Sequence, residues 1–323
     1  MRVTVIGAGA VGGWLAATLA KGGAEVALVA RGATLDRVRE HGLTLLSGEQ
    51  RATYRLAAAE RAQELPKPDA VVLAVKTHAF ADAVAAASPA LAHGPLLVTA
   101  MNGLPWWFLD GLAGPLANQR LESVDPGGKA AAMLGSVRPV GAVVHASMRA
   151  EAPGVIRVAA VDRLILGEPG TTVSRETIQF DQLIKGGGVE SVLTKDIRLE
   201  IWAKLWGNMN MNPVSALTRL TANGIFGEPR LFDLVRAMMT EFFRVGERLG
   251  IALPMTVDER LVVTRRLGDF RTSMLNDVEA GRALEVEGLL GAVVELAEKL
   301  GEPVPASCAV YALARGLNRR HPG

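Results

Sequence analysis

The sequence contains almost no cysteine, since Cys308 is the only one among 323 residues. A single thiol excludes an intramolecular disulfide and a cysteine-rich metal site, and it fits a reducing, cytoplasmic compartment. No metal site is predicted. Aromatic residues are also scarce, at 5% of the chain. We therefore expect a core built mainly from Ala, Val and Leu.

The chain also lacks an excess of charge of one sign. It has 35 Lys and Arg against 33 Asp and Glu, which gives a formal net charge of +2. Binding to nucleic acid or to an anionic membrane surface normally needs a basic patch or a basic excess. Neither partner is predicted.

No hydrophobic run is long enough to predict a membrane span. Residues 83–109 carry no charged side chain, but prolines and glycines interrupt them repeatedly. The apolar residues 1–20 resemble a signal peptide in composition. The regular spacing of the glycines in this segment indicates a glycine-rich loop between a strand and a helix rather than a signal peptide.

A GxGxxG motif follows an apolar strand at the start of the chain and opens an apolar helix. The first glycine permits a tight turn, the second lets a pyrophosphate approach the backbone, and the third lets helix and strand pack closely. Amides at the start of the helix then face the phosphates. Residues 25–30 read as a second parallel strand. The pattern predicts a dinucleotide-binding site formed by Gly7, Ala8, Gly9, Ala10, Val11 and Gly12.

Arg31 comes directly after this second strand, where NAD-binding proteins carry an acidic residue for the ribose hydroxyls. A guanidinium group instead binds a phosphate with two hydrogen bonds. The cofactor is therefore predicted to be NADPH. The alternative is that Arg31 is an ordinary solvated residue at a strand end.

Two further strands are predicted at 69–75 and 96–99, with a helix at 80–91 between them. The first is apolar throughout, as expected for a central strand covered on both faces. Lys76 and Asn102 follow these strands. Open α/β sheets bind ligands at the carboxyl ends of their strands, so both residues are candidates for cofactor binding. A surface lysine and an ordinary turn asparagine are the alternatives.

The remaining chain divides into a short sheet extension and a long helical part. Strands near a sheet edge are predicted at 43–46 and 53–56. Short antiparallel strands are predicted at 140–144, 155–159 and 163–166, and residues 121–133 are interpreted as a surface insertion. From Asp196 helical periodicity dominates, with breaks expected near Pro213 and 223–224 among others. The expected fold is α/β: a doubly wound Rossmann-type domain, residues 1–194, followed by an all-helical substrate and catalytic domain, residues 195–323.

The first helix of the second part is apolar nearly all round, which predicts a buried helix. One polar stripe with a four-residue repeat interrupts it, formed by Glu200, Lys204, Asn208 and Asn212. Burial would lower the pKa of Lys204 towards neutrality, and this suits a proton donor to a carbonyl oxygen during hydride transfer. The alternative is an exposed stripe with an ordinary Glu200–Lys204 surface pair.

A helix is also predicted from Glu285 onward, with Glu285 on its apolar face and Glu287 pointing outward. Glu285 would interact with the helix dipole or polarise a bound group. Periodicity does not decide between a core and a homodimer interface for Met238, Met239, Phe242 and Phe243.

Taken together in order, these motifs resemble the ketopantoate reductase (2-dehydropantoate 2-reductase) family over nearly the whole chain. The motifs are the glycine loop, Val75-Lys76-Thr77, Asn102-Gly103, Trp202-Ala203-Lys204-Leu205, Ser273-Met274-Leu275-Asn276-Asp277 and Glu285-Val286-Glu287.

The resemblance implies reduction of a 2-keto acid by NADPH, in the biosynthesis of pantothenate. It implies that Lys204 is the general acid, that Glu285 supports the active site, and that Asn208, Asn212 and Ser273 hold the substrate. Asn102 and Lys76 would lie near the cofactor, and Arg31 near its phosphate.

The sequence departs from the family at Glu287, where aspartate is common, at Leu290, where asparagine precedes the glycine, and in the 121–133 segment. The acyl chain of the keto acid therefore stays open. Two other functions are kept: a β-hydroxyacid dehydrogenase, and a sensor that binds NADP(H) without catalysis.

Overall fold

The computed structural model describes residues 1–135 and 137–320. Contacts along the chain divide it into two compact units. The sheet unit comprises Met1–Met101 and Gly128–Ile197, and the helical unit comprises Asn102–Gly127 and Arg198–Gly323. The α/β class followed by helices is confirmed. The units differ from two continuous domains because residues 102–127 leave the sheet unit and join the helical one.

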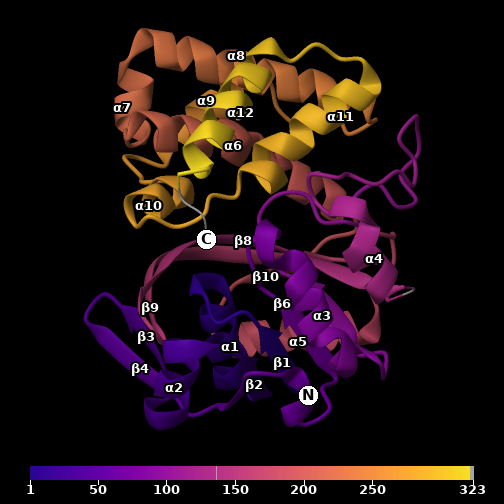
Figure 1. Cartoon of the computed structure of the whole chain (residues 1–323), viewed down its shortest axis with the longest axis vertical. Helices are drawn as coiled ribbons and strands as arrows, with labels where there is room; N and C mark the ends of the chain where they lie inside the picture. The colour runs from indigo at the N-terminus through magenta and orange to yellow at the C-terminus, as the bar shows by residue number, and fades with distance from the viewer. Residues whose placement is uncertain (136, 321–323) are drawn as a thin grey trace. The chain divides into compact units, whose positions relative to one another are not determined.

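The sheet unit is built on one sheet, which has ten strands within the described residues. Six neighbouring strands run parallel in the order β5-β2-β1-β6-β7-β8. Figure 1 labels β1, β2, β6 and β8 among them. Successive strands are added first on one side of β1 and then on the other, which is the doubly wound arrangement. These strands are β1 Arg2–Ile6, β2 Glu25–Val29, β5 Ala57–Ala59, β6 Ala70–Leu73, β7 Leu96–Thr99 and β8 Pro139–Ala152.

The strand predicted at 69–75 is confirmed as a central strand, because β6 pairs with β1 and β7 and all its residues are buried. The predicted bounds of β7 and of the helix α3 (Phe80–Leu91) agree with the structure. The helices of this unit are α1 Ala10–Lys21, α2 Gly32–His41, α3, α4 Lys129–Leu134 and α5 Arg175–Gly186, with the 3-10 turns η1 Ala62–Glu64, η2 Thr77–Ala79 and η3 Pro126–Gly128 at its border.

The sheet extends beyond β8 through a long antiparallel hairpin with β9 (Val155–Gly167). Strand β3 (Leu43–Ser47) pairs with β9, β4 (Gln50–Tyr54) forms the edge as expected, and β10 (Ser191–Leu193) also pairs with β9. The predicted strand residues and their antiparallel pairing are confirmed, but 155–159 and 163–166 belong to one strand, β9, and not to two. Irregular pairing within the hairpin, for example between His145 and Ala146, breaks the two-residue alternation on which the prediction relied.

The helical unit packs around the helix α6 (Ile197–Thr218). Trp202 of α6 is fully buried and stacks on Phe242, with 4.0 Å between ring centroids, and on Phe108 at 5.8 Å. Met238, Met239 and Phe242 are also fully buried, so they belong to the core rather than to an interface. The other helices are α7 Ala222–Gly227, α8 Pro229–Arg248, α9 Val257–Arg266, α10 Ser273–Glu279, the π-helical turn η4 Glu287–Gly291, α11 Ala292–Leu300 and α12 Pro305–Asn318.

The breaks predicted near Pro213 and 223–224 are wrong. Pro213 lies inside α6, and Asn223 and Gly224 lie inside α7. The chain turns between them at Arg219, whose φ is +62°. A proline costs one backbone hydrogen bond in a helix, and here the buried neighbours Met211 and Val214 hold the helix in place around it.

The interpretation of residues 121–133 as a surface insertion is also wrong. Leu121 and Val124 are buried, and so is Ala130 at the start of α4. The carboxylate of Glu295 on α11 accepts hydrogen bonds from the amides of Glu122 and Ser123, both at 2.9 Å. A composition typical of exposed turns therefore forms an anchored segment, because the half-buried carboxylate of Glu295 accepts hydrogen bonds from its amides.

Candidate active site

The polar stripe of α6 has the graded burial expected of a functional face on a core helix. Trp202 and Met209 are fully buried on the opposite side, whereas Glu200, Lys204 and Asn208 are half-buried. Asn212 is enclosed, with 5% of its surface exposed. The exposed-stripe alternative therefore does not hold.

Lys204 is the centre of this stripe. Its Nζ donates a hydrogen bond to Oδ1 of Asn102 at 2.9 Å. Burial lowers the pKa of Lys204 to about 8, and the negative charge of Glu285 acts in the opposite direction. At neutral pH the amine is therefore protonated but gives up its proton more readily than an ordinary lysine. This is the property needed in a general acid.

Asn102 belongs to the helical unit, and the contact it makes there is with Lys204. The turn that carries it is tight, because Gly103 has φ +82° and a Cβ atom at this position would lie 2.2 Å from the carbonyl oxygen of Gly288. The amide of Leu104 donates to the same oxygen at 3.3 Å. The Asn102 turn is thus held against η4.

Glu285 is buried, with 8% of its surface exposed, whereas the side chain of Glu287 is 43% exposed. The predicted inward and outward directions agree with this. The predicted regular helix does not, because Glu285 precedes the first helical residue and η4 is a π-helical turn. Single π-helical turns are frequent at functional sites. A periodicity analysis at 100° per residue assumes a regular α-helix and does not detect them.

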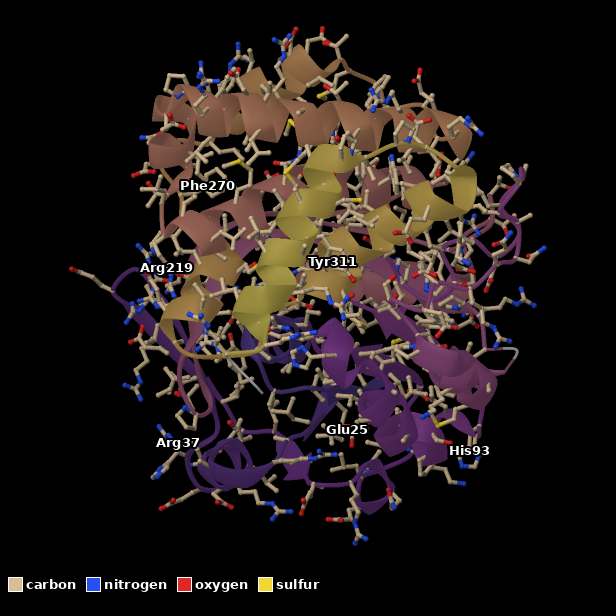
Figure 2. All side chains as sticks on the ribbon, turned by 45° about the horizontal axis from the view of Figure 1, so that its top comes forward. Glu25, Arg37, His93, Arg219, Phe270 and Tyr311 are labelled. Carbon is tan, nitrogen blue, oxygen red and sulfur yellow. The ribbon has the colours of Figure 1, made fainter. Side chains whose placement is uncertain are left out.

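Sequence reasoning missed the side chains that hold η4 from outside. Figure 2 shows Tyr311 on α12. Its hydroxyl donates to the carboxylate of Glu287, and Nε of Arg315 lies 3.2 Å from the other carboxylate oxygen. Burial, together with the charge of Glu287, raises the pKa of Tyr311 to about 12. The spacing of Tyr311 and Arg315, one turn apart on a helix, is the only sequence signal that could have suggested this cluster.

Ser273 is the first residue of α10 and is exposed. The cap of this helix is supplied by the preceding residue, since the hydroxyl of Thr272 accepts from the amide of Leu275 at 3.1 Å. The Ser273 hydroxyl is therefore not needed for capping.

In the sheet unit, the glycine loop has the geometry of a phosphate cradle. Gly7 has φ +104°, and a Cβ at Gly12 would lie 1.8 Å from the carbonyl oxygen of Gly7. Gly9 is the N-cap of α1, and a Cβ there would meet nothing within 4 Å. The first turn of α1 carries no acidic residue. The amides at the amino end of α1 and the open space at Gly9 fit a phosphate group.

Arg31 and Lys76 also lie at carboxyl ends of strands. Arg31 is exposed and occupies the N-cap position of α2, two residues after β2. Lys76 is half-buried and precedes η2, after β6. Ala8, Ala10 and Val11 complete the loop between β1 and the body of α1.

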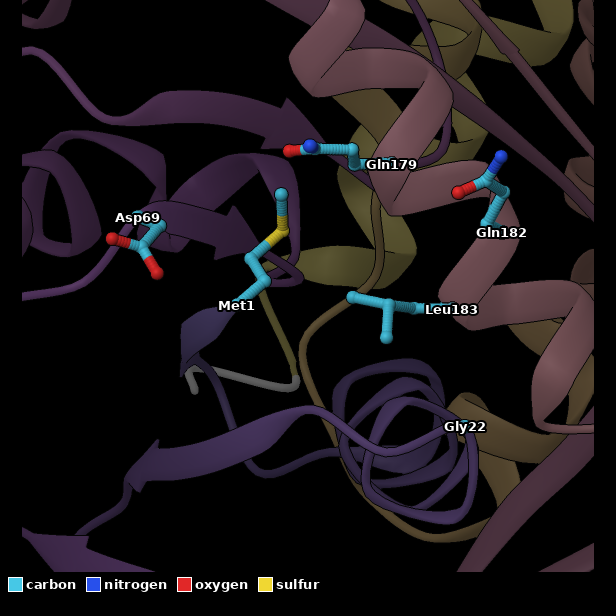
Figure 3. A pocket seen from close by; sticks show the side chains of 6 residues that line it. All are labelled: Met1, Gly22, Asp69, Gln179, Gln182 and Leu183. Atoms are coloured by element: carbon cyan, nitrogen blue, oxygen red, sulfur yellow. The ribbon is translucent and has the colours of Figure 1, made fainter.

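A pocket of about 500 Å³ lies elsewhere in the sheet unit, at the amino ends of β1 and β6. Figure 3 shows Met1 and Asp69 beside the α5 side chains Gln179, Gln182 and Leu183. Ligands in such sheets bind at the opposite, carboxyl ends, so this pocket is separate from the glycine loop. Among the described residues no group of three or more His, Cys, Asp and Glu side chains is arranged to hold a metal ion, and no helix is long and apolar enough to cross a membrane.

Comparison with known proteins gives consistent matches over both units. Residues 3–170 match the family model described as ketopantoate reductase PanE/ApbA, and residues 196–318 match the model for its C-terminal part. A 2-dehydropantoate 2-reductase of Mesorhizobium japonicum is 41% identical over 98% of each chain.

Two solved structures have the same fold. One from Ralstonia solanacearum MolK2, described as a ketopantoate reductase, superimposes with a TM-score of 0.93 at 38% identity over 98% of each chain. A D-mandelate dehydrogenase solved with NADH and anilino(oxo)acetate has a TM-score of 0.85 at 16% identity over 99% of each chain, and shares the fold. The chain belongs to the ketopantoate reductase family of oxidoreductases.

Proposed function

We propose that this protein is an NADPH-dependent 2-keto acid reductase, with 2-dehydropantoate as its substrate and Lys204 as its general acid. The observation that carries the proposal is the state of Lys204: the amine of a half-buried side chain, held by Asn102 at 2.9 Å, with its pKa lowered by desolvation to about 8. Reduction of a ketone requires a proton at the carbonyl oxygen, and a group titrating near the working pH delivers it best.

The other residues of the helical unit have supporting roles. Asn102 orients the Lys204 amine because its Oδ1 accepts a hydrogen bond from Nζ. Glu285 keeps a larger fraction of that amine charged, since its carboxylate raises the lysine pKa. Asn208, Asn212 and Ser273 bind polar groups of the substrate, because amides and hydroxyls donate to carbonyl and hydroxyl oxygens.

The residues of the sheet unit hold the cofactor. When bound, NADPH supplies the hydride. The amides that begin at Gly9 bind its pyrophosphate, Arg31 binds the 2′-phosphate, and Lys76 lies beside the cofactor. The exposed guanidinium of Arg31 at the end of β2, where an NAD site has an acid, supports NADPH over NADH.

The test is a panel of 2-keto acids, with 2-dehydropantoate first, monitored by NADPH and NADH absorbance. We expect turnover with NADPH, and a fall in kcat of about 10²- to 10⁴-fold in Lys204→Met, the usual contribution of a general acid. The matched control is Lys299→Met, on the surface of α11. Unchanged kcat in Lys204→Met would remove the lysine from the mechanism. Binding of NADPH without turnover of any keto acid would favour the sensor.

A further inference from the structure

Arg260 is an arginine on the inward face of α9 that has no ion-pair partner among the described residues. It is half-buried beside Leu261 and Thr264, both buried. Its Nε is fully enclosed and has no hydrogen-bond partner in the part of the chain that the structure describes. Enclosing one nitrogen of a charged group without a partner is costly, and partial burial of the side chain lowers the pKa of Arg260.

Other arginines of the helical unit show how this cost is normally avoided. Arg282 lies 2.9 Å from the carboxylate of Asp277, Arg244 lies 2.9 Å from that of Glu302, and Arg265 stacks over the ring of Phe232. Arg260 makes none of these contacts. An anion that is not part of the chain would supply the partner that the Arg260 guanidinium lacks among these contacts.

The guanidinium of Arg260 is directed at α6. A Cβ atom at Gly207 would lie 2.9 Å from Nη2 of Arg260. Glycine is the poorest helix former after proline, yet it occupies the interior of this 22-residue core helix. Its absent side chain leaves the space in which the guanidinium lies.

Gly207 is placed close to the groups that act on the substrate. It is three residues after Lys204 and directly precedes Asn208. Residues three apart on a helix are neighbours, with about 5–6 Å between their Cβ positions. The guanidinium therefore approaches α6 one helical turn from the proton donor.

We propose that Arg260 binds the carboxylate of the 2-keto acid substrate. The inference rests on the proposed function, because it takes the substrate to be a 2-keto acid. In such an acid the carboxylate is bonded directly to the carbonyl carbon, so a cation one turn from Lys204 suits a substrate whose carbonyl oxygen faces that lysine. The planar fork of an arginine matches a carboxylate with two hydrogen bonds. Asn208, Asn212 and Ser273 are uncharged, so they cannot neutralise the negative charge of the substrate carboxylate.

The first test compares Arg260→Gln with Arg266→Gln, an exposed arginine of the same helix. Arg260→Gln should raise KM for 2-dehydropantoate about 10- to 100-fold, the loss expected for hydrogen bonds to a charged group. It should leave KM for NADPH unchanged, and it should change KM for the methyl ester of the acid much less. Arg266→Gln should match the wild type. An unchanged KM for the acid, or an equal rise for acid and ester, would overturn the proposal.

A second variant guards against misfolding of the first. Gly207→Ala favours the helix but places a methyl group where the guanidinium lies, so it should also raise KM for the acid while thermal stability is kept. Oxalate binding, measured by calorimetry in the presence of NADPH, tests the carboxylate site at Arg260 separately from the proposed keto acid reductase function. If wild type binds oxalate, Arg260→Gln does not, and no keto acid is reduced, the proposed function fails and the carboxylate site stands. If keto acids are reduced and neither variant alters KM or oxalate binding, the carboxylate site fails.

Discussion

The glycine loop of the sheet unit and the lysine site of the helical unit are built in different ways. The loop lies within residues 7–12, and its shape follows from backbone space: Gly7 has φ +104°, and a side chain at Gly12 would collide with the loop itself. The lysine site is assembled from three distant segments, carrying Asn102, Lys204 and Glu285. The first depends on absent side chains, whereas the second depends on the environment of one charged group.

This difference leads to different sensitivities. A backbone cradle should fail when any atom is added, whatever its chemistry, because the backbone cannot move aside. A site based on a perturbed pKa should tolerate changes of shape better than changes of charge. Four experiments examine this contrast, beginning with the largest expected effect.

Gly12→Ala should abolish NADPH binding and lower the free energy of unfolding by about 3 kcal/mol or more, since the added atom would meet the carbonyl oxygen of Gly7 at 1.8 Å. Gly9→Ala is the matched variant, because its Cβ meets nothing within 4 Å. It should fold normally and lose affinity for NADPH alone. Chemical denaturation and fluorescence titration measure the two effects. Equal stability of Gly12→Ala and wild type would contradict the collision.

Arg31→Ala should raise KM for NADPH about 10- to 100-fold and leave KM for NADH unchanged, because only NADPH carries the 2′-phosphate. Steady-state kinetics with both cofactors measure this. Arg51→Ala, on the edge strand β4, is the control for loss of an exposed positive charge in the same unit. A parallel loss with both cofactors would show that Arg31 acts on something other than the phosphate.

The pH profile of kcat/KM should fall above about pH 8, because Lys204 must be protonated to act as an acid and its pKa lies there. Glu285 raises that pKa, so Glu285→Gln should move the alkaline limb to lower pH, by about one unit. Glu279→Gln, on the exposed end of α10, should leave the limb in place. A limb that stays put in Glu285→Gln, or moves to higher pH, would be inconsistent with this electrostatic role.

Tyr311→Phe should have the smallest effect, a loss of about 1 kcal/mol in the free energy of unfolding, since it removes one hydrogen bond to Glu287 and leaves Arg315 in place. The other tyrosine, Tyr54 on β4, serves as control in Tyr54→Phe. Thermal unfolding measures both. If Tyr311→Phe instead lowered kcat as strongly as Lys204→Met, the Tyr311 hydroxyl would have a direct part in the reaction.

Local patterns predicted much of the fold. The strand β7 and the helix α3 have their predicted bounds, because their apolar periodicity is regular and turn residues flank them. Prediction failed where a distant residue decided the local structure. The carboxylate of Glu295 anchors a turn-rich segment by accepting hydrogen bonds from its amides, and the packing of α6 keeps the helix continuous through Pro213.

The candidate site divides in the same manner. The four-residue repeat that contains Lys204 is visible in the sequence, and so is the buried position of Glu285. The partnership of Lys204 with Asn102, the π-helical turn with its Tyr311 and Arg315 contacts, and the approach of Arg260 to Gly207 are not visible. Each joins segments that are far apart in the chain or departs from the regular helical repeat.

The sequence by itself determined the glycine cradle, the central strands and helices of the sheet unit, and the residue types available for proton transfer. These depend on short-range sterics and on periodicity, which neighbouring residues specify. Only the tertiary structure decided the state of the lysine. Its pKa near 8 arises from enclosure by groups on other elements and from the opposing charge of Glu285, and the energy of a charge depends on everything that surrounds it in space.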